Sequence, residues 1–203
     1  MPTLYIVRHA QSEANVLNLL AGQVDFPLSA QGQADAAQIA QQFCAQYQPE
    51  RIICSPLLRA QQTAQPFAQL LNLPIETDAR LIEQNMGKFS GMGYPEAEAD
   101  PTYQQDRSAR WHWVPAGGGE SYEMMAQRTR AFLKDLLTAQ GDILMVTHAV
   151  AMRLLRANIE HTLPRYPEST AANGEIWQVQ LHTLEQPNPI ELLDFGCMRH
   201  HRA

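Results

Sequence analysis

Leu4-Tyr5-Ile6-Val7-Arg8-His9-Ala10 is the stretch that decides the fold of this 203-residue chain. Four apolar residues run directly into a cation and an imidazole. A short continuous apolar run is typical of a strand buried on both faces of a parallel sheet. Such a strand presents the residues that follow it at the carboxyl edge of the sheet, where open α/β sheets bind their ligands. We therefore expect Arg8 and His9 to lie in a functional site, with His9 at its chemical centre.

Two later stretches have the same design. Residues 143–146 (Ile-Leu-Met-Val) run into Thr147, His148 and Ala149, and residues 51–54 (Arg-Ile-Ile-Cys) run into Ser55 and Pro56. A short third strand is expected at 75–77. The alternation in 176–181 and the apolar run in 190–195 predict two final strands, joined by a turn that contains two prolines.

Helical spacing of apolar residues separates these strands. It predicts helices that begin after Ser29, at Leu58, after Ser121 and at Val150, with Pro66 kinking or breaking the second of them. Strands that alternate with helices indicate an α/β fold. We expect three layers, α/β/α, around a mostly parallel sheet that ends in an antiparallel pair. No repeat or linker is visible, so residues 1–203 should form a single domain, with a lid-like insertion at about 94–119.

Composition narrows the class of protein. A net charge of −6 and a pI near 5.6 argue against a nucleic-acid partner, which needs clustered cations. No stretch approaches the roughly 18 apolar residues of a membrane span, and no signal peptide is apparent. The three cysteines form no CxxC pair and cannot all be paired with one another, which favours a reducing compartment. We expect a cytoplasmic protein, and the sequence sets no expectation for its oligomeric state.

If the strands are parallel neighbours, His9, His148, Arg8 and Arg59 converge at one edge of the sheet. Guanidinium forks match the oxygens of a phosphate group, and a neutral imidazole is a nucleophile near pH 7. A leaving alkoxide also needs a proton from a nearby acid. Glu83 is the candidate for this acid, and Glu120 is its competitor. This set of side chains predicts transfer of a phosphoryl group from a small phosphorylated substrate.

Two histidines near acidic residues could also indicate a zinc site. Arg8 and Arg59 would repel a divalent cation from that position, so we expect no metal. The P-loop pattern is absent from the sequence, and we expect no cofactor.

Five motifs in order resemble those of the histidine phosphatase superfamily, which includes the cofactor-dependent phosphoglycerate mutases. They are Leu4 to Asn15, Ser55 to Ala64, Leu81-Ile82-Glu83 with Gly87 and Gly91, Gly119-Glu120-Ser121, and Val146 to Ala149. The resemblance covers nearly the whole chain. It implies a phosphoglycerate mutase-like fold and a phosphorylated nucleophile at His9.

The resemblance also implies the roles of the other site residues. Arg8, Arg59 and His148 would hold the phosphoryl group, and Glu83 would be the proton donor. The residues implied to bind the substrate are Asn15, Gln23 and Ala149. Ala10 and Ala149 depart from the family pattern, because many members have glycine at these two positions.

The segment between Glu83 and Gly119, which we expect to cover the site, distinguishes a hydrolase from a mutase. Mutases of the family carry a longer, basic insertion, whereas this chain offers Arg107 and Arg110 beside Trp111 and Trp113. A shorter, less basic cover leaves room for water, so we expect a metal-independent phosphomonoester hydrolase. A phosphoglycerate mutase and a non-catalytic phosphate- or phosphoprotein-binding module remain the alternatives. Whether Trp111 and Trp113 touch the substrate is left open by the sequence.

Overall fold

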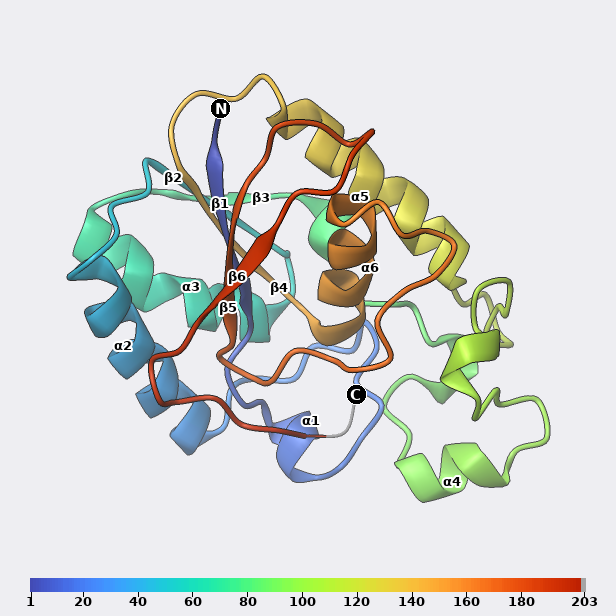
Figure 1. Cartoon of the computed structure of the whole chain (residues 1–203). Helices are drawn as coiled ribbons and strands as arrows, with labels where there is room; N and C mark the ends of the chain where they lie inside the picture. Colours follow the sequence, from blue (N-terminus) through green and yellow to red (C-terminus); the bar gives the residue numbers. More distant parts are fainter. Residues whose placement is uncertain (202–203) are drawn as a thin grey trace.

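A six-stranded sheet with the order β3-β2-β4-β1-β5-β6 forms the centre of the computed structural model, which describes residues 1–201 (Figure 1). Four parallel strands make up most of it: β1 (Thr3–Arg8), β2 (Arg51–Cys54), β3 (Ile75–Thr77) and β4 (Ile143–Thr147). Two strands complete the sheet through antiparallel pairings, β5 (Ile176–Gln180) with β1 and β6 (Ile190–Leu193) with β5. The expected mostly parallel sheet with an antiparallel end is confirmed.

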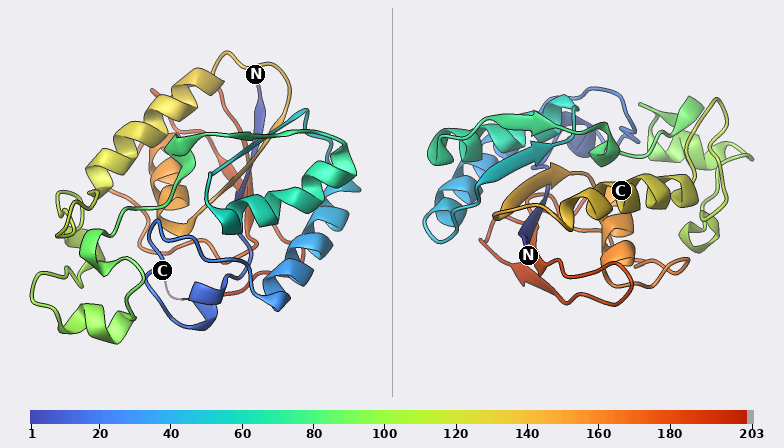
Figure 2. Two further views of the ribbon diagram at one scale, coloured as in Figure 1. Left: turned by 180° about the vertical axis from the view of Figure 1, so that it is seen from behind. Right: turned by 90° about the horizontal axis from the view of Figure 1, so that it is seen from above.

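Two pairs of long helices cover the two faces of the sheet (Figure 2). One face carries α2 (Ala30–Cys44) and α3 (Leu58–Leu71), and the other carries α5 (Tyr122–Leu136) and α6 (Ala149–Ile159). These are the three layers that the sequence predicts. One expectation was wrong in part, because α3 does not break at Pro66 but continues to Leu71. Phe67 and Ala68 anchor this part of α3, since both are buried against the sheet.

The central position of β1 follows from its apolar run. Leu4 and Ile6 point into the core under α5 and α6, whereas Tyr5 and Val7 point into the core under α2 and α3. Because successive side chains of a strand alternate between faces, a strand between two helical layers must be apolar at every position. β1 pairs with β4 on one side and β5 on the other, so its end is enclosed by both neighbours.

The polar segment between β3 and α5 contains only short elements. They are the 3-10 helices η1 (Ala79–Leu81), η2 (Gly87–Phe89) and η3 (Arg107–Ala109) and the α-helix α4 (Tyr94–Ala99). The segment projects beside the carboxyl edge of the sheet, near the short helix α1 (Glu13–Val16) (Figure 1). A small apolar cluster joins the two regions, with Phe89, Tyr94 and Tyr103 from the segment packed near Leu20.

Among the described residues, no helix has the length and apolar character needed to cross a membrane.

Candidate active site

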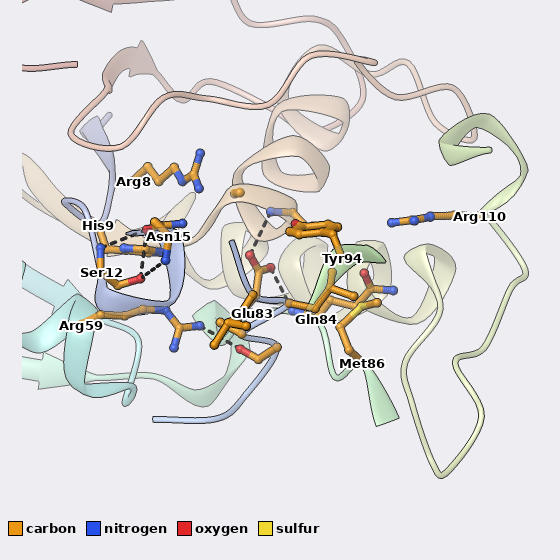
Figure 3. A pocket seen from close by; sticks show the side chains of 16 residues that line it. Arg8, His9, Ser12, Asn15, Arg59, Glu83, Gln84, Met86, Tyr94 and Arg110 are labelled. Atoms are coloured by element: carbon orange, nitrogen blue, oxygen red, sulfur yellow. Dashed lines mark hydrogen bonds between the residues drawn. The ribbon is translucent and has the colours of Figure 1, made fainter. Parts of the chain in front are cut away.

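An open cleft lies at the carboxyl edge of the sheet, and the empty space in and above it, open solvent included, is about 530 Å³. Figure 3 shows the side chains around it. At one end are Arg8, the last residue of β1, His9, which follows it directly, and Arg59 from α3. The other end is formed by the segment between β3 and α5, through Tyr94 and Arg110 among others. The cleft therefore has a cationic end that holds His9 and a second end that is built from loops.

The parallel pairing of β1 and β4 brings the two histidines together. The His9 amide donates to the Thr147 carbonyl at 2.9 Å, which continues the sheet register past the end of both strands. The ring centroids of His9 and His148 are 5.1 Å apart. His148 is fully buried and His9 is 4% exposed. Two imidazoles from positions 139 residues apart thus share one site, as the sequence predicts.

The hydrogen bonds of His9 define which ring nitrogen is available. Its Nδ1 lies 2.7 Å from the Ala10 carbonyl oxygen, which can only accept, so Nδ1 carries the proton. Nε2 therefore carries the free lone pair. Burial, with the charges of Arg59 and Arg8, holds the pKa of His9 well below its usual value of 6.5. His9 is consequently neutral and able to act as a nucleophile at physiological pH.

His148 has the opposite arrangement. Its Nε2 lies 2.7 Å from the Ser55 hydroxyl, which accepts from the Leu57 amide and can donate its own proton to Nε2. When the Ser55 hydroxyl donates, the proton of His148 resides on Nδ1, which is buried and has no partner among residues 1–201. Burial is the largest cause that lowers the pKa of His148, followed by the charge of Arg59. In this tautomer His148 offers a neutral N–H donor.

Both arginines are almost fully buried and are held by backbone carbonyls. Arg8 donates from Nη1 to the Ala171 carbonyl, and Arg59 donates to the Gly22 and Val24 carbonyls at 2.8 and 2.9 Å. The Nε groups of both arginines are buried without a partner in the described chain. Burial lowers the pKa of Arg8 to about 10, a value at which the side chain is still charged at neutral pH. The orphaned donors are suited to an anion.

Glu83 reaches the same cleft from the loop that follows η1. One carboxylate oxygen accepts from the amides of Gln84 (2.9 Å) and Ala151 (3.2 Å), and the other accepts from the Val150 amide at 3.2 Å (Figure 3). Its carboxylate therefore rests on the first turn of α6, where a helix favours negative charge. Its competitor Glu120 is bound to Arg128 by two hydrogen bonds of 2.7 and 3.0 Å, and it is not among the residues that line the cleft. The geometry favours Glu83 as the acid.

The three residues implied to bind substrate lie in different positions. Ala149 lines the cleft, and so does Asn15, whose Oδ1 accepts from the Ser12 amide and hydroxyl and from Asn173 Nδ2. Asn15 can therefore offer its Nδ2 donor to an anion. Gln23 is not among the lining side chains, because its Nε2 donates to the Glu83 carbonyl at 3.0 Å. The substrate-binding roles of Asn15, Gln23 and Ala149 stay predictions.

Sequence reasoning missed Asn173, and it named Arg110 as a cation of the cover without placing it in the cleft. Asn173, in the loop before β5, donates from Nδ2 to the carbonyls of His9 and Ala10, and it was not recognised because no motif surrounds it. Arg110 lines the far end of the cleft although it is only 4% exposed. Its guanidinium lies over the rings of Tyr103 and Trp113, and such interleaving of Arg with aromatic residues in 103–113 was the signal available.

The two tryptophans of the segment pack against other side chains. Trp113 contacts Phe89 and Tyr103, and Trp111 stacks on Tyr166 with the ring centroids 6.2 Å apart. Neither lines the cleft. We therefore interpret both as packing residues that support the loop-built end.

Comparison with known proteins agrees with this geometry. The sequence pattern of the histidine phosphatase superfamily (branch 1) matches residues 4–184. The chain belongs to this superfamily. The prediction that it is a histidine phosphatase, and therefore an enzyme, is confirmed at the level of the family.

Individual members of the superfamily show similar sequences. The chain is 33% identical over 161 residues to phosphoserine phosphatase 1 of Hydrogenobacter thermophilus, covering 76% of this chain and 74% of that protein. It is 33% identical over 164 residues to the probable phosphoglycerate mutase GpmB of Yersinia enterocolitica, covering 78% and 75%. It is 30% identical over 144 residues to the glucosyl-3-phosphoglycerate phosphatase of Mycobacterium tuberculosis, covering 68% and 62%. Relatives named as phosphatases and as mutases are thus equally similar to the chain.

Solved structures confirm the fold class. The mycobacterial glucosyl-3-phosphoglycerate phosphatase in complex with VO3 superposes with a TM-score of 0.83 at 25% identity, covering 95% of this chain and 98% of that one. A putative alpha-ribazole-5'-P phosphatase from Escherichia coli has a TM-score of 0.83 at 21% identity and covers 99% of both chains. The three-layer histidine phosphatase fold is therefore the fold of this chain.

Proposed function

We propose that this histidine phosphatase is a metal-independent phosphomonoester hydrolase that forms a phosphohistidine on His9. One observation carries the proposal. The buried guanidinium donors Arg8 Nε and Arg59 Nε have no partner in the described chain, and neither has the buried His148 Nδ1, which is a donor when Ser55 donates to Nε2. Both arginines act electrostatically on the neutral imidazole of His9. An unsatisfied buried polar group is costly, so a set of three near a nucleophile supports an anion that binds there.

In the first step, His9 Nε2 attacks the phosphorus atom of the substrate. The N–P bond forms while the bond from phosphorus to the ester oxygen breaks, and Glu83 gives a proton to the departing alkoxide. The three equatorial oxygens carry the negative charge of the transition state, and the donors of Arg8, Arg59 and His148 stabilise it. The Nδ1–H bond of His9 to the Ala10 carbonyl keeps the ring oriented for in-line attack.

In the second step, water attacks the phosphohistidine. Glu83, now a carboxylate, takes a proton from the water as its oxygen bonds to phosphorus. The N–P bond breaks, inorganic phosphate leaves, and the lone pair returns to Nε2 of His9. Arg8 and Arg59 supply the positive charge that stabilises the phosphoryl oxygens in both steps. The proposed mechanism therefore requires no metal ion.

A hydrolase is favoured over a mutase by the loop-built end of the cleft. Arg110 is the cation that this end brings to the lining, and the remaining wall there is made of Gln84, Met86 and Tyr94. A mutase must retain the dephosphorylated product until the phosphoryl group returns to it, which requires strong polar contacts to that product. A single cation at this end of a cleft that is open to water is suited instead to release of the dephosphorylated product. A phosphoglycerate mutase would move phosphate between the hydroxyls of a phosphoglycerate faster than it releases inorganic phosphate.

The test is the fate of the phosphoryl group on His9. The protein is mixed with p-nitrophenyl phosphate, quenched under conditions that preserve phosphohistidine, and digested for mass spectrometry. We expect an added phosphate on the peptide that contains His9, and a loss of turnover of roughly 10³-fold or more in His9→Ala. Activity should be unchanged by EDTA. Full activity of His9→Ala would contradict the proposal, and binding of phosphomonoesters without turnover would favour a non-catalytic binding module.

A further inference from the structure

The backbone of Glu83 is held by two side chains that lie outside the cleft. Gln23, from the loop after α1, donates from Nε2 to the Glu83 carbonyl at 3.0 Å. Arg128, on α5, donates from Nη2 to the same carbonyl at 3.4 Å and from Nη1 to the Arg80 carbonyl at 2.6 Å. One acceptor thus receives hydrogen bonds from two distant segments of the chain, and this acceptor belongs to the proposed proton donor.

Arg128 is itself fixed in one orientation. Its Nε and Nη2 bind the two carboxylate oxygens of Glu120 at 2.7 and 3.0 Å, and both side chains are about 15% exposed. Glu120 is held in turn through its backbone, since its carbonyl accepts from Gln84 Nε2 at 2.7 Å. A bidentate pair of this kind fixes the plane of the guanidinium. The remaining N–H groups of Arg128 are therefore directed at residues 80 and 83.

These contacts determine where the Glu83 carboxylate can lie. It accepts from the Gln84 amide at 2.9 Å and from the amides of Val150 and Ala151 at 3.2 Å, and the two longer bonds are long for a charged acceptor. Gln84 directly follows Glu83, so its bond moves with the Glu83 backbone, and only the two long bonds tie the carboxylate to α6. The position of its backbone, set by Gln23 and Arg128, therefore contributes to the distance between the acid and a leaving-group oxygen.

We propose that Gln23 and Arg128 are positioning residues for the proton donor Glu83, with Glu120 as the group that orients Arg128. The proposal rests on the acid role of Glu83 in the proposed function. It also gives Gln23 a role different from the substrate contact that the family resemblance implies. A misplacement of about 1 Å in a catalytic group can cost 10²-fold in rate, so loss of either residue is expected to slow the steps that use Glu83.

The test compares two substrates that differ in their need for a proton. Glycerol 2-phosphate leaves as an alkoxide and requires the acid, whereas p-nitrophenyl phosphate leaves as a stabilised phenolate and requires it far less. Arg128→Lys keeps the charge near His148 but removes the guanidinium fork. Gln23→Ala removes the other bond. The comparison uses kcat/KM, because this ratio depends only on the steps up to release of the leaving group and excludes the hydrolysis step in which Glu83 serves both substrates. We expect each variant to lose roughly ten-fold in kcat/KM on glycerol 2-phosphate, with little loss on p-nitrophenyl phosphate.

The matched control is Arg130→Lys, two residues further along α5. Arg130 binds the Leu184 carbonyl and Glu185, neither of which lines the cleft. This variant should lose equally little on both substrates. Glu83→Gln supplies the reference, since it removes the acid and should show the largest selective loss. Adding Arg128→Lys to Glu83→Gln should cause no further loss on glycerol 2-phosphate, because residues that act through one group are not additive.

The outcomes separate the two proposals. If Glu83→Gln lowers kcat/KM equally for both substrates, the acid role of Glu83 is wrong and the proposed function must change. If Glu83→Gln is selective but Gln23→Ala and Arg128→Lys are not, the positioning role alone is overturned. Equal losses on both substrates for Arg128→Lys, together with a lowered melting temperature, would also overturn it for Arg128. Gln23→Ala decides the question if Arg128→Lys does not fold.

Discussion

The two ends of the cleft are built in different ways. In the proposed reaction the cationic end is the phosphate end, and the end built from loops is the leaving-group end. The phosphate end is lined by Arg8, His9 and Arg59, and His148 does not line the cleft but packs against His9 with the ring centroids 5.1 Å apart. These residues lie at the ends of β1 and β4 and in the first turn of α3, and all are at most 4% exposed. The leaving-group end is made of side chains from the segment between β3 and α5, residues 78–121, which contains only single turns and one short helix. The first end is positioned by sheet register, and the second by an apolar cluster of loop residues.

This difference suggests a division of roles, in which the phosphate end carries out the reaction and the leaving-group end determines substrate specificity. Groups fixed by a central sheet cannot shift without disrupting the core, so they suit the step that every phosphomonoester shares. Groups on loops can change with little cost to the fold, so they suit recognition of one leaving group. Variants at the two ends should therefore differ in whether their effect depends on the substrate.

The largest effect is expected at Arg59. Arg59→Met removes a guanidinium from the phosphate end, and loss of one such stabilising group typically costs about 10²–10³ in kcat. The loss should be similar for aryl and alkyl phosphates, because the phosphoryl group is common to both. Steady-state rates on a panel of phosphomonoesters measure it. Arg51→Met is the control, since Arg51 pairs with Glu76 at the far end of β2 and should retain full rates.

Arg59 also binds the Gly22 and Val24 carbonyls, so the melting temperature of Arg59→Met must be measured beside its activity. Arg59→Lys keeps the charge without the fork and should recover only part of the rate. A loss that is confined to one class of leaving group would contradict the division between the two ends.

A smaller, substrate-dependent effect is expected at Arg110. Its guanidinium lines the leaving-group end and is held by the Gln104 carbonyl and the Tyr103 hydroxyl at 2.9 Å each. Arg110→Leu should lower kcat/KM by about ten-fold for substrates whose leaving group carries a second anion, as one charged hydrogen bond contributes that much. For p-nitrophenyl phosphate the change should be slight. An equal loss on both kinds of substrate would place Arg110 in the common chemistry instead.

The smallest effect is expected in the pKa of His9, at the phosphate end. Burial and two cations lower the pKa of His9, so its imidazole should stay neutral well below pH 6.5. Histidine NMR spectra recorded against pH, with the His9 signal assigned by its loss in His9→Asn, give the midpoint directly. A midpoint at or above 6.5 would show that Arg8 and Arg59 do not act on His9 as the geometry indicates.

The same shift links stability to pH with a defined sign. His9 and His148 bind protons more weakly in the folded chain than in the unfolded one. Their contribution to the free energy of unfolding is therefore complete above about pH 6.5 and falls as the pH drops toward their folded pKa values.

The phosphate end could be predicted from sequence because each of its residues adjoins a strong local pattern. β1 and β4 are continuous apolar runs, and the residues after them reach one edge once the strands are parallel. The leaving-group end could not be predicted, since Tyr94 and Arg110 come together through tertiary contacts of short loops. The predicted break at Pro66 was wrong for a related reason. Local propensity disfavours proline inside a helix, but the burial of Phe67 and Ala68 outweighs that cost.

The central position of β1 also has a consequence for how the chain folds. Leu4 pairs with Ile143 on one side and with Val179 on the other, so the strand that leads to His9 is synthesised long before both of the strands that pair with it. Contacts of such long range make folding slow, because loop closure must precede the gain from pairing. An apolar strand that stays unpaired while the intervening residues are synthesised is prone to aggregation. The cleft around His9 therefore forms only after β4 and β5 have been synthesised and paired with β1.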